Sequence, residues 1–399
     1  MHPNSIRPAP LSAFGLVTYA LAAAGGVLGY MPLLALLLPL KVNALVDVDR
    51  YGLLATCGVA GAIVAGLANI AFGWLGDRSV ARGGGRRGWL RCGAIATLLS
   101  FAAFILADDA VTIVASIIFF QIAINVVLAQ IAALIAHEVP AAQKGTTAAL
   151  LTLGNPLAAG ASALVVAVAS SEAARLAIVA ALMIACVAPL AFSPARVAPV
   201  VDSATHLGVA SRRNLTIAWA SRLLMQIANS GVGLYLLFYF EELPGDGAQV
   251  PARLSGLLLV AALVPVPLAM LLGRWSDRIR RQTPFLAATS ALATAGLLGM
   301  ALAGDWVSGS ISYVAVATGA AVFVALNTGY AMLLLPSGAR CGRDLGILNL
   351  ANTLPQVVAP LLAWQSTEAH GFGVGLMILA ALALTAGLLP LLLNEDQQR

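Results

Sequence analysis

Twelve long apolar runs dominate the sequence, and they constrain its fold more than any other feature. A helix that spans a membrane needs about 20 mostly apolar residues, and each run reaches or approaches that length. Only 10% of the residues are charged, whereas a soluble domain carries about 25%. The sequence therefore predicts an all-α polytopic membrane protein with twelve transmembrane helices. The expected spans are residues 13–40, 51–75, 89–107, 110–137, 146–169, 174–192, 214–241, 253–273, 284–303, 310–335, 345–365 and 372–393.

The same composition excludes several other classes of protein. Disordered chains and nucleic-acid-binding domains need a polar or basic surface, so we expect a lipid bilayer and no nucleic acid as partner. The four cysteines show no metal-ligand spacing, and we interpret them as reduced packing residues. The sequence has no G-x4-GK-[ST] phosphate loop and no evident catalytic constellation. We therefore expect neither an enzyme nor a bound cofactor or metal.

Basic residues are unevenly distributed over the connections between the runs. If both termini face the cytoplasm, 17 of the 22 Lys and Arg residues lie on the inner side, four lie on the outer side, and Arg222 lies within a span. Positive residues gather on the cytoplasmic side of membrane proteins. We therefore expect a multi-pass protein of the cell's inner membrane with both termini in the cytoplasm. We also expect the protein to be a monomer.

The longest connection divides the chain into two sets of six runs. It covers residues 193–213, SPARVAPVVDSATHLGVASRR. We expect an N-terminal six-helix lobe at residues 1–192, a cytoplasmic linker at 193–213 and a C-terminal six-helix lobe at 214–399.

A Gly-x3-Asp-Arg element recurs at matching places in the two halves. Gly73, Asp77 and Arg78 follow the second span, and their counterparts Gly273, Asp277 and Arg278 follow the eighth span 200 residues later. There are two weaker repeats of sequence. One follows spans 4 and 10, and the other lies within spans 5 and 11. Together they predict two parallel six-helix repeats, a layout of secondary transporters.

The recurring element also predicts a conformational latch. The glycine allows two helices to approach closely, the aspartate can accept hydrogen bonds from the N-terminus of a neighbouring helix, and the arginine can bridge to the other lobe or to a lipid phosphate. We expect such contacts to hold one conformation and to break in another. An ordinary pair of positively charged loops is the alternative.

Segments around this element resemble a known family. GWLGDRSVARGGGRRGW (Gly73 to Trp89) and GRWSDRIRRQTP (Gly273 to Pro284) resemble the signature loops of the major facilitator superfamily. The first loop, together with GRDLGILNLANTLPQVVAP (Gly342 to Pro360) and RLLMQIANSGVGLYLLFYFEE (Arg222 to Glu242), is similar to the glycoside–pentoside–hexuronide and sucrose-transporter-like branch. The resemblance implies the major facilitator fold and favours a sugar or glycoside as substrate.

The sequence departs from that branch in its acidic residues. Melibiose-permease-like members carry membrane-embedded acids for cation coupling, and spans 1 and 2 here have none. Sucrose-type members often have an aspartate where this chain has His137. His137 can titrate near neutral pH, so we keep it as a candidate proton relay, with capping of the helix end as the alternative.

Polar residues inside the spans are the candidate substrate-binding residues, because such groups usually face the interior of the helix bundle. Amides and phenols can donate and accept hydrogen bonds, which suits a solute with many hydroxyls. The alternative for each amide is a hydrogen bond that joins two helices. The candidates are Tyr19, Gln121, Asn125, Arg222, Gln226, Asn229, Asn327, Tyr330, Asn352 and Gln356.

Arg222 is the most informative of these residues. It lies about eight residues into the seventh span, or about 12 Å at 1.5 Å per residue, with no acidic residue of the span beside it. It is a candidate anchor for a carboxylate, phosphate or sugar hydroxyl of the solute. The alternatives are snorkelling of the side chain to the cytoplasmic interface and a hydrogen bond to a neighbouring helix.

The sequence thus predicts a secondary active or facilitative transporter that moves a small polar organic solute by alternating access. A sugar or glycoside is the favoured class, an anionic one included, and protons stay open as the coupling ion of a symport. One alternative is a multidrug transporter, which is expected to show more aromatic residues than the 6% found here. The other is a membrane protein that binds a ligand without transporting it.

Overall fold

A computed structural model describes residues 10–45, 50–140, 143–196, 209–244, 250–279, 281–334 and 341–392. Helices are the only regular secondary structure in these ranges. In the first half they are α1 (Ala13–Pro32), the π-helical turn η1 (Leu33–Leu37), α2 (Leu38–Leu45), α3 (Arg50–Ala81), α4 (Arg86–Leu106), α5 (Ala110–Glu138), α6 (Lys144–Leu151), α7 (Gly154–Val168) and α8 (Glu172–Ala191).

The second half repeats this pattern of long apolar helices. It contains α9 (Val209–Glu242), α10 (Val250–Leu263), α11 (Pro265–Ile279), α12 (Thr283–Leu302), α13 (Trp306–Leu334), α14 (Cys341–Thr353), α15 (Pro355–Leu388) and the 3-10 turn η4 (Leu389–Leu392). α15 is helical through residues 366–371, which the sequence analysis treats as a connection.

The apolar helices confirm the expected all-α polytopic membrane fold. Ten helices in the described ranges are long and apolar enough to cross a membrane. They coincide with ten of the twelve expected spans. The seventh and eleventh expected spans correspond to α9 and to the junction of α14 with α15, where the polar residues of the candidate site lie.

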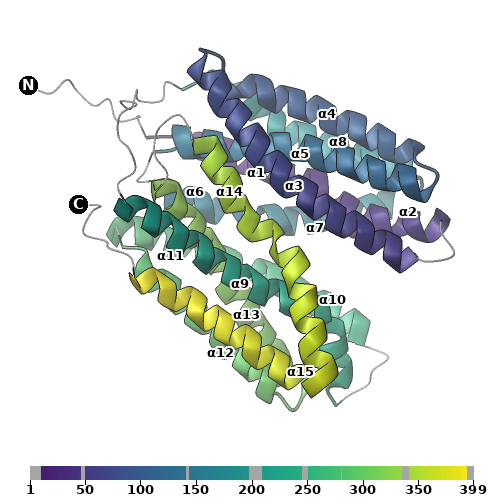
Figure 1. The fold of residues 1–399 in the computed structure, drawn as a ribbon, viewed down its shortest axis with the longest axis vertical. Helices are drawn as coiled ribbons and strands as arrows, with labels where there is room; N and C mark the ends of the chain where they lie inside the picture. Colours follow the sequence, from purple (N-terminus) through teal and green to yellow (C-terminus); the bar gives the residue numbers. More distant parts are fainter. Residues whose placement is uncertain are drawn as a thin grey trace, which may run out of the picture. The chain divides into compact units, whose positions relative to one another are not determined.

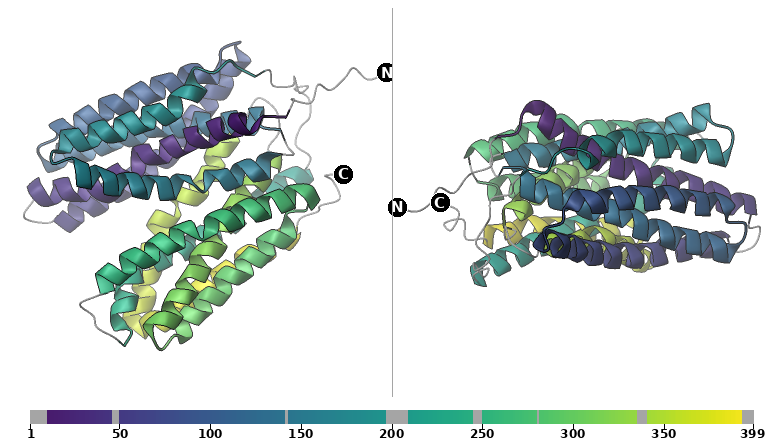
Figure 2. Two further views of the ribbon diagram at one scale, coloured as in Figure 1. Left: turned by 180° about the vertical axis from the view of Figure 1, so that it is seen from behind. Right: turned by 90° about the horizontal axis from the view of Figure 1, so that it is seen from above.

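The chain packs as two compact units. The first comprises Met1–Gln143, Leu153–Thr205 and Leu335–Asn349, and the second comprises Lys144–Thr152, His206–Leu334 and Leu350–Arg399. In the first unit α1, α3, α4, α5 and α8 lie along one another, and in the second α9, α12, α13 and α15 do so (Figures 1 and 2). Compared with the predicted lobes, each unit takes one short segment from the other half of the chain.

Three of the expected spans are interrupted where prolines follow. The breaks lie at Thr152–Leu153 between α6 and α7, at Val264 between α10 and α11, and at Leu354 between α14 and α15. A proline has no N–H, so the carbonyl four residues earlier loses its helical hydrogen bond. Two of these prolines, Pro265 and Pro355, are the first residues of α11 and α15. α9, by contrast, continues without a break through Gly231 and Gly233.

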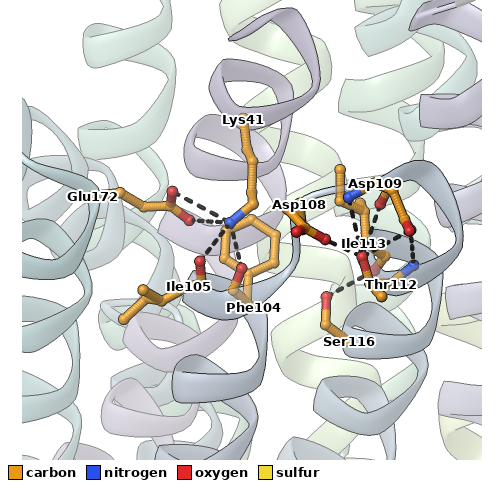
Figure 3. Close-up of polar contacts among 9 residues, drawn as sticks. All are labelled: Lys41, Phe104, Ile105, Asp108, Asp109, Thr112, Ile113, Ser116 and Glu172. Carbon is orange, nitrogen blue, oxygen red and sulfur yellow. Dashed lines mark hydrogen bonds and ion pairs between the residues drawn. The ribbon is translucent and has the colours of Figure 1, made fainter. Parts of the chain in front are cut away.

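A buried lysine ties three helices together at one end of the first unit (Figure 3). The Nζ of Lys41, in the middle of α2, lies 3.0 Å from Oε1 of Glu172 at the start of α8. The same ammonium donates to the carbonyl oxygens of Phe104 and Ile105 in the last turn of α4, the second over 3.1 Å. A cation at the C-terminus of a helix also interacts favourably with its dipole. Lys41 therefore joins α2, α4 and α8.

Two aspartates cap α5 and α13, which occupy matching places in the two halves. Asp109 accepts a hydrogen bond from the backbone N–H of Thr112 over 2.7 Å (Figure 3), and Asp305 accepts one from that of Ser308 over 3.0 Å. These backbone hydrogen bonds, with those to the Thr112 and Ser308 hydroxyls, lower the pKa of both carboxyl groups below its usual value. The shared Asp-x2-Thr/Ser pattern adds a further echo of the repeat.

Close helix contacts hold the second unit together. Gly319 of α13 approaches the α12 backbone so closely that a Cβ at this position would lie 2.5 Å from the backbone nitrogen of Ala293. The Ser221 hydroxyl of α9 donates to the carbonyl of Ala386 over 2.6 Å. Small residues at helix interfaces are typical of membrane bundles, because they allow the backbones to pack closely.

Candidate functional site

Four polar side chains meet in the second unit. Nε of Arg222 donates to Oδ1 of Asn352 over 3.0 Å, and Nη1 of Arg222 donates to Oγ1 of Thr328 over 2.5 Å. Nε2 of Gln226 donates to the same Asn352 oxygen over 3.1 Å. These four residues form what we call the Arg222 cluster. Arg222, Gln226 and Asn352 are sequence-predicted site residues, and the structure adds Thr328.

Each member of the Arg222 cluster is positioned by its helix. Arg222 and Gln226 lie one turn apart on α9, so they share a face. Asn352 precedes the break at Leu354, and binding sites of secondary transporters often lie at such discontinuous helices. The Thr328 hydroxyl donates to the carbonyl of Val324 within α13 over 2.7 Å, which leaves its oxygen lone pair for Arg222.

The cluster places a guanidinium among neutral groups. Its two hydrogen-bond partners are an amide and a hydroxyl, and none of the described residues forms an ion pair with Arg222. Arg222 lies 13 residues after Val209, the first residue of α9, or about 20 Å along the helix at 1.5 Å per residue. The guanidinium donates to side chains on α13 and at the α14–α15 junction, so its geometry fits hydrogen bonds to neighbouring helices and does not fit snorkelling toward a lipid interface.

Amide side chains also gather in the first unit. Nδ2 of Asn69 on α3 donates to Oδ1 of Asn125 on α5 over 3.0 Å. Nδ2 of Asn125 in turn lies 2.8 Å from the carbonyl oxygen of Gln121, one turn earlier. Asn125 is buried and Gln121 is partly exposed. The structure thus brings the two predicted residues Gln121 and Asn125 together and adds Asn69.

The other predicted substrate-binding residues take no part in the hydrogen bonds that define these two clusters. Tyr19 is buried and donates to the Glu138 carboxylate. Asn327 is also buried, and its Nδ2 donates to the carbonyl of Ala218 over 3.0 Å, which joins α13 to α9. Tyr330 packs against Ala218. The remaining two, Asn229 and Gln356, are exposed.

Asp77 meets the N-terminus of α14 inside the first unit. Its Oδ1 accepts the backbone N–H of Gly342 over 2.9 Å, and its Oδ2 accepts that of Arg343 over 3.0 Å. The first N–H groups of a helix have no partner within the helix and carry the positive end of its dipole. A carboxylate is therefore well suited to this position, as the sequence predicts for Asp77.

Glycines bring the two helices into contact at this junction. A Cβ added to Gly73 of α3 would lie 2.6 Å from the carbonyl carbon of Gly342, and one added to Gly342 would lie 2.9 Å from Oδ1 of Asp77. Neither position has room for a side chain. We call the contact of Gly73 and Asp77 with Gly342 and Arg343 the α3–α14 junction.

Arg86, and not Arg78, is the ion-pair partner of Asp77. The Arg86 guanidinium is buried and pairs with the Asp77 carboxylate. It also lies 3.4 Å from Oε1 of Gln130 and, through Nη2, 3.4 Å from Nε2 of His137. The guanidinium of Arg78 instead lies over the ring of Trp74, 5.4 Å from its centroid. Arg86 starts the next helix, so helix packing and not proximity in sequence selects it.

The corresponding element of the second half shows a similar but looser contact. A Cβ added to Gly273 of α11 would lie 2.9 Å from the carbonyl oxygen of Gly145 and 3.3 Å from Cβ of Ala149, both in the short helix α6. Arg278 is exposed. The side chain of Asp277 lies outside the part of the chain that the structure describes, so its expected role stays a prediction.

Comparison with known proteins identifies the family. The model of the Major Facilitator Superfamily matches residues 12–340. The chain belongs to the major facilitator superfamily. None of the curated protein sequences compared matches it significantly. The glycoside–pentoside–hexuronide and sucrose-transporter-like branch stays a prediction.

Solved structures of other superfamily members share the fold. The human organic anion transporter MFSD10 (TETRAN) has a TM-score of 0.70 and 15% identity, covering 98% of this chain and 100% of that one. A bacterial homologue of the iron transporter ferroportin in its outward-facing state has a TM-score of 0.73 and 13% identity, covering 94% of this chain and 97% of that one. FucP in the outward conformation has a TM-score of 0.70 and 14% identity, covering 94% of this chain and 98% of that one. At these identities the likeness shows the fold alone.

A further ion pair that the sequence does not predict joins α4 to α5 in the first unit. Arg87 of α4 binds Glu138 at the end of α5 through two hydrogen bonds of 2.7 and 2.9 Å. The Glu138 carboxylate also accepts from Tyr19, and Arg87 reaches the Ser193 hydroxyl over 3.2 Å. This arrangement fixes α1, α4 and α5 to one another. The only available signal was that Arg86 and Arg87 follow a loop and Glu138 ends an apolar run.

Proposed function

We propose that this protein is a secondary transporter, active or facilitative, that moves a small polar organic solute across the inner membrane by alternating access. The favoured solute is a sugar or glycoside, an anionic one included. The observation that carries the proposal is the Arg222 cluster, a set of hydrogen-bonding side chains at a broken helix of a major facilitator fold.

The chemistry of the two polar clusters supports a polar solute. Amide and hydroxyl groups can each donate or accept, which suits a ligand rich in hydroxyls. Asn69, Gln121 and Asn125 supply only amides, and the Arg222 cluster supplies two amides, a hydroxyl and a guanidinium. Two of the structural neighbours are described as a proton:xylose symporter and a fucose:proton symporter. They support sugars as the first solutes to test.

In the same proposal the α3–α14 junction acts as the latch of one conformation. Asp77 binds two backbone N–H groups of α14, and Gly73 permits the approach. We infer that α14 leaves α3 when the transporter changes conformation, and that the Asp77–Arg86 ion pair stays with the first unit because both residues lie on its helices. In this proposal Arg78 also belongs to the latch, and so does the matching element of Gly273, Asp277 and Arg278 in the second half.

The driving force is a separate part of the proposal. His137 is kept as the candidate proton relay, because its Nε2 lies 3.4 Å from Nη2 of Arg86, beside the latch. Symport with protons predicts that solute uptake acidifies the receiving compartment. Facilitated transport predicts that it does not.

Solute counterflow in proteoliposomes tests the proposed function. The purified protein is reconstituted with an excess of unlabelled solute inside, and the transient accumulation of labelled solute is measured. The panel contains neutral sugars, glycosides, sugar acids and lipophilic cations. We expect counterflow of a sugar, glycoside or sugar acid. The proposal also places both termini on the cytoplasmic side and expects a monomer to be active. Counterflow of the lipophilic cations alone favours multidrug transport, and counterflow of no solute favours a protein that only binds.

A further inference from the structure

The Arg222 guanidinium has donors that the protein does not use. A guanidinium carries five N–H groups, and in this structure one on Nε and one on Nη1 bind Asn352 and Thr328. Nη2 has no hydrogen-bond partner among the described residues. Three of the five N–H groups, one on Nη1 and two on Nη2, are therefore not used by the described residues.

The same guanidinium has no compensating negative charge. Its partners are neutral, and no carboxylate of the described residues pairs with it. A charge inside a membrane protein is costly unless it is paired. Two buried cations differ in this respect, because Lys41 is paired with Glu172 and Arg86 with Asp77. A ligand of opposite charge would neutralise Arg222 in the same way.

We propose that the Nη1–Nη2 edge of Arg222 binds a carboxylate of the transported solute, so that the solute is a polar organic monocarboxylate such as a sugar acid. Two parallel N–H···O bonds between a guanidinium edge and a carboxylate are a strong and geometrically specific contact. This inference rests on the proposed function and names the substrate class of the same site.

Asn352 holds the guanidinium in the orientation that this contact needs. Its Oδ1 accepts from Nε of Arg222 and from Nε2 of Gln226, so the Nε edge is occupied and the opposite edge is the one presented. Thr328 fixes Nη1 from a second side. Asn352 and Thr328 are positioning residues for Arg222, and Gln226 in turn fixes the Asn352 amide.

The charge of the cluster selects a carboxylate over a phosphate. Arg222 contributes a single positive charge, which a monocarboxylate neutralises. A phosphate monoester carries about −1.5 to −2 at pH 7 and would leave negative charge unpaired beside the neutral Asn352, Thr328 and Gln226. Sites for phosphates usually provide a second cation or a helix N-terminus.

Ligand-induced thermal stabilisation of the purified wild-type protein tests the inference directly. The probes are matched pairs that differ in charge: D-gluconate with sorbitol, and D-glucuronate with its methyl ester. D-glucose 6-phosphate tests the phosphate alternative. We expect at least one of the two acids to raise the melting temperature, and its neutral partner to bind about 10- to 100-fold more weakly, the range expected for hydrogen bonds to a charged group.

Variants assign that preference to Arg222. In Arg222→Gln we expect the acid to lose its advantage over the neutral partner, and in Arg222→Lys we expect the advantage to be reduced, because a lysine cannot make the two parallel bonds. Arg91→Gln is the matched control, since Arg91 is exposed and lies over the ring of Phe192 in the first unit. It should bind like the wild type.

Several results would overturn the inference. They are equal binding of acid and neutral partner by the wild type, binding of the phosphate in preference to both acids, no binding of either acid, or an acid preference that survives in Arg222→Gln. The first three of these results need no variant, so the inference can be tested even if Arg222→Gln fails to fold. Counterflow of neutral sugars in any of these cases would keep the proposed function while removing the carboxylate.

Discussion

A single added methyl group at the α3–α14 junction should open it. In Gly73→Ala the new Cβ would lie 2.6 Å from the carbonyl carbon of Gly342. Real Cβ atoms essentially never approach another heavy atom closer than 3.0 Å, so α3 and α14 must separate by several tenths of an ångström. The obstacle is rigid backbone on both sides, and no side chain can rotate away.

The matched control lies on the same helix. Gly58→Ala adds the same methyl group to α3 at a position where a Cβ meets nothing within 4 Å. Both variants gain the same helix propensity, about 0.5–1 kcal/mol, so their difference isolates the packing at the junction. Overpacking costs typically about 1–3 kcal/mol. That range corresponds to a change of about 5- to 150-fold in the ratio of closed to open junction.

Hydrogen–deuterium exchange reports this ratio at the junction itself. The backbone N–H groups of Gly342 and Arg343 bind Asp77, so their exchange follows the opening of the contact. We expect these amides to exchange about 5- to 150-fold faster in Gly73→Ala than in Gly58→Ala, with a lower melting temperature for Gly73→Ala. Equal exchange rates and equal melting temperatures in the two variants would refute the reasoning.

Three further predictions concern other parts of the molecule. Gly273→Ala should destabilise the protein less than Gly73→Ala in thermal unfolding, because its new Cβ would stay 2.9 Å from the nearest atom, a milder clash. The caps Asp109 and Asp305 have lowered pKa values, so their stabilisation is fully present above the ordinary aspartate pKa of about 3.9 and is lost as the pH falls through the lower folded pKa. The melting temperature of the double variant Asp109→Ala/Asp305→Ala should therefore lie below that of the wild type at pH 7 and approach it at low pH. Lys41→Met should cost about 2 kcal/mol, since it removes hydrogen bonds from a charged donor to Glu172 and to the end of α4, and the melting temperature measures this loss.

Each of these predictions has its own control or contradicting result. The control for Gly273→Ala is Gly256→Ala on α10, where a Cβ meets nothing within 4 Å. A larger loss of melting temperature in Gly256→Ala than in Gly273→Ala would contradict the prediction. A difference in melting temperature between the wild type and the double variant that does not change with pH would show that the two carboxylates do not stabilise the helix starts. A melting temperature for Lys41→Met equal to that of the wild type would show that the ammonium is not a tie between helices.

The spans and the repeat could be predicted because they depend on local properties. An apolar run of about 20 residues is enough to indicate a membrane helix, and the prolines Pro265 and Pro355 indicate helix breaks because they lack an N–H. The turn at Thr152–Leu153 was missed as a break, although Pro156 gives the same signal. The repeated caps Asp109 and Asp305 were also present in the sequence as an Asp-x2-Thr/Ser pattern.

Partners across helices could not be predicted in this way. Asp77 pairs with Arg86 and not with Arg78, because α3 and α4 present these two side chains to each other. The sequence predicts that Lys41 is a loop residue directly after an apolar run, yet its ammonium lies against the C-terminal end of α4. Thr328 was overlooked because its role depends on the distance between α13 and α9. Such contacts arise from tertiary packing, which one sequence does not encode as a local pattern.

Counterflow of labelled D-gluconate into proteoliposomes preloaded with unlabelled D-gluconate tests the central claim most directly. With the wild-type protein the account predicts transient accumulation that sorbitol inside the vesicles does not support. It predicts that Arg222→Gln loses this accumulation and that Arg91→Gln keeps it. Accumulation by Arg222→Gln at the wild-type rate, or equal exchange of sorbitol and gluconate by the wild type, would contradict the account.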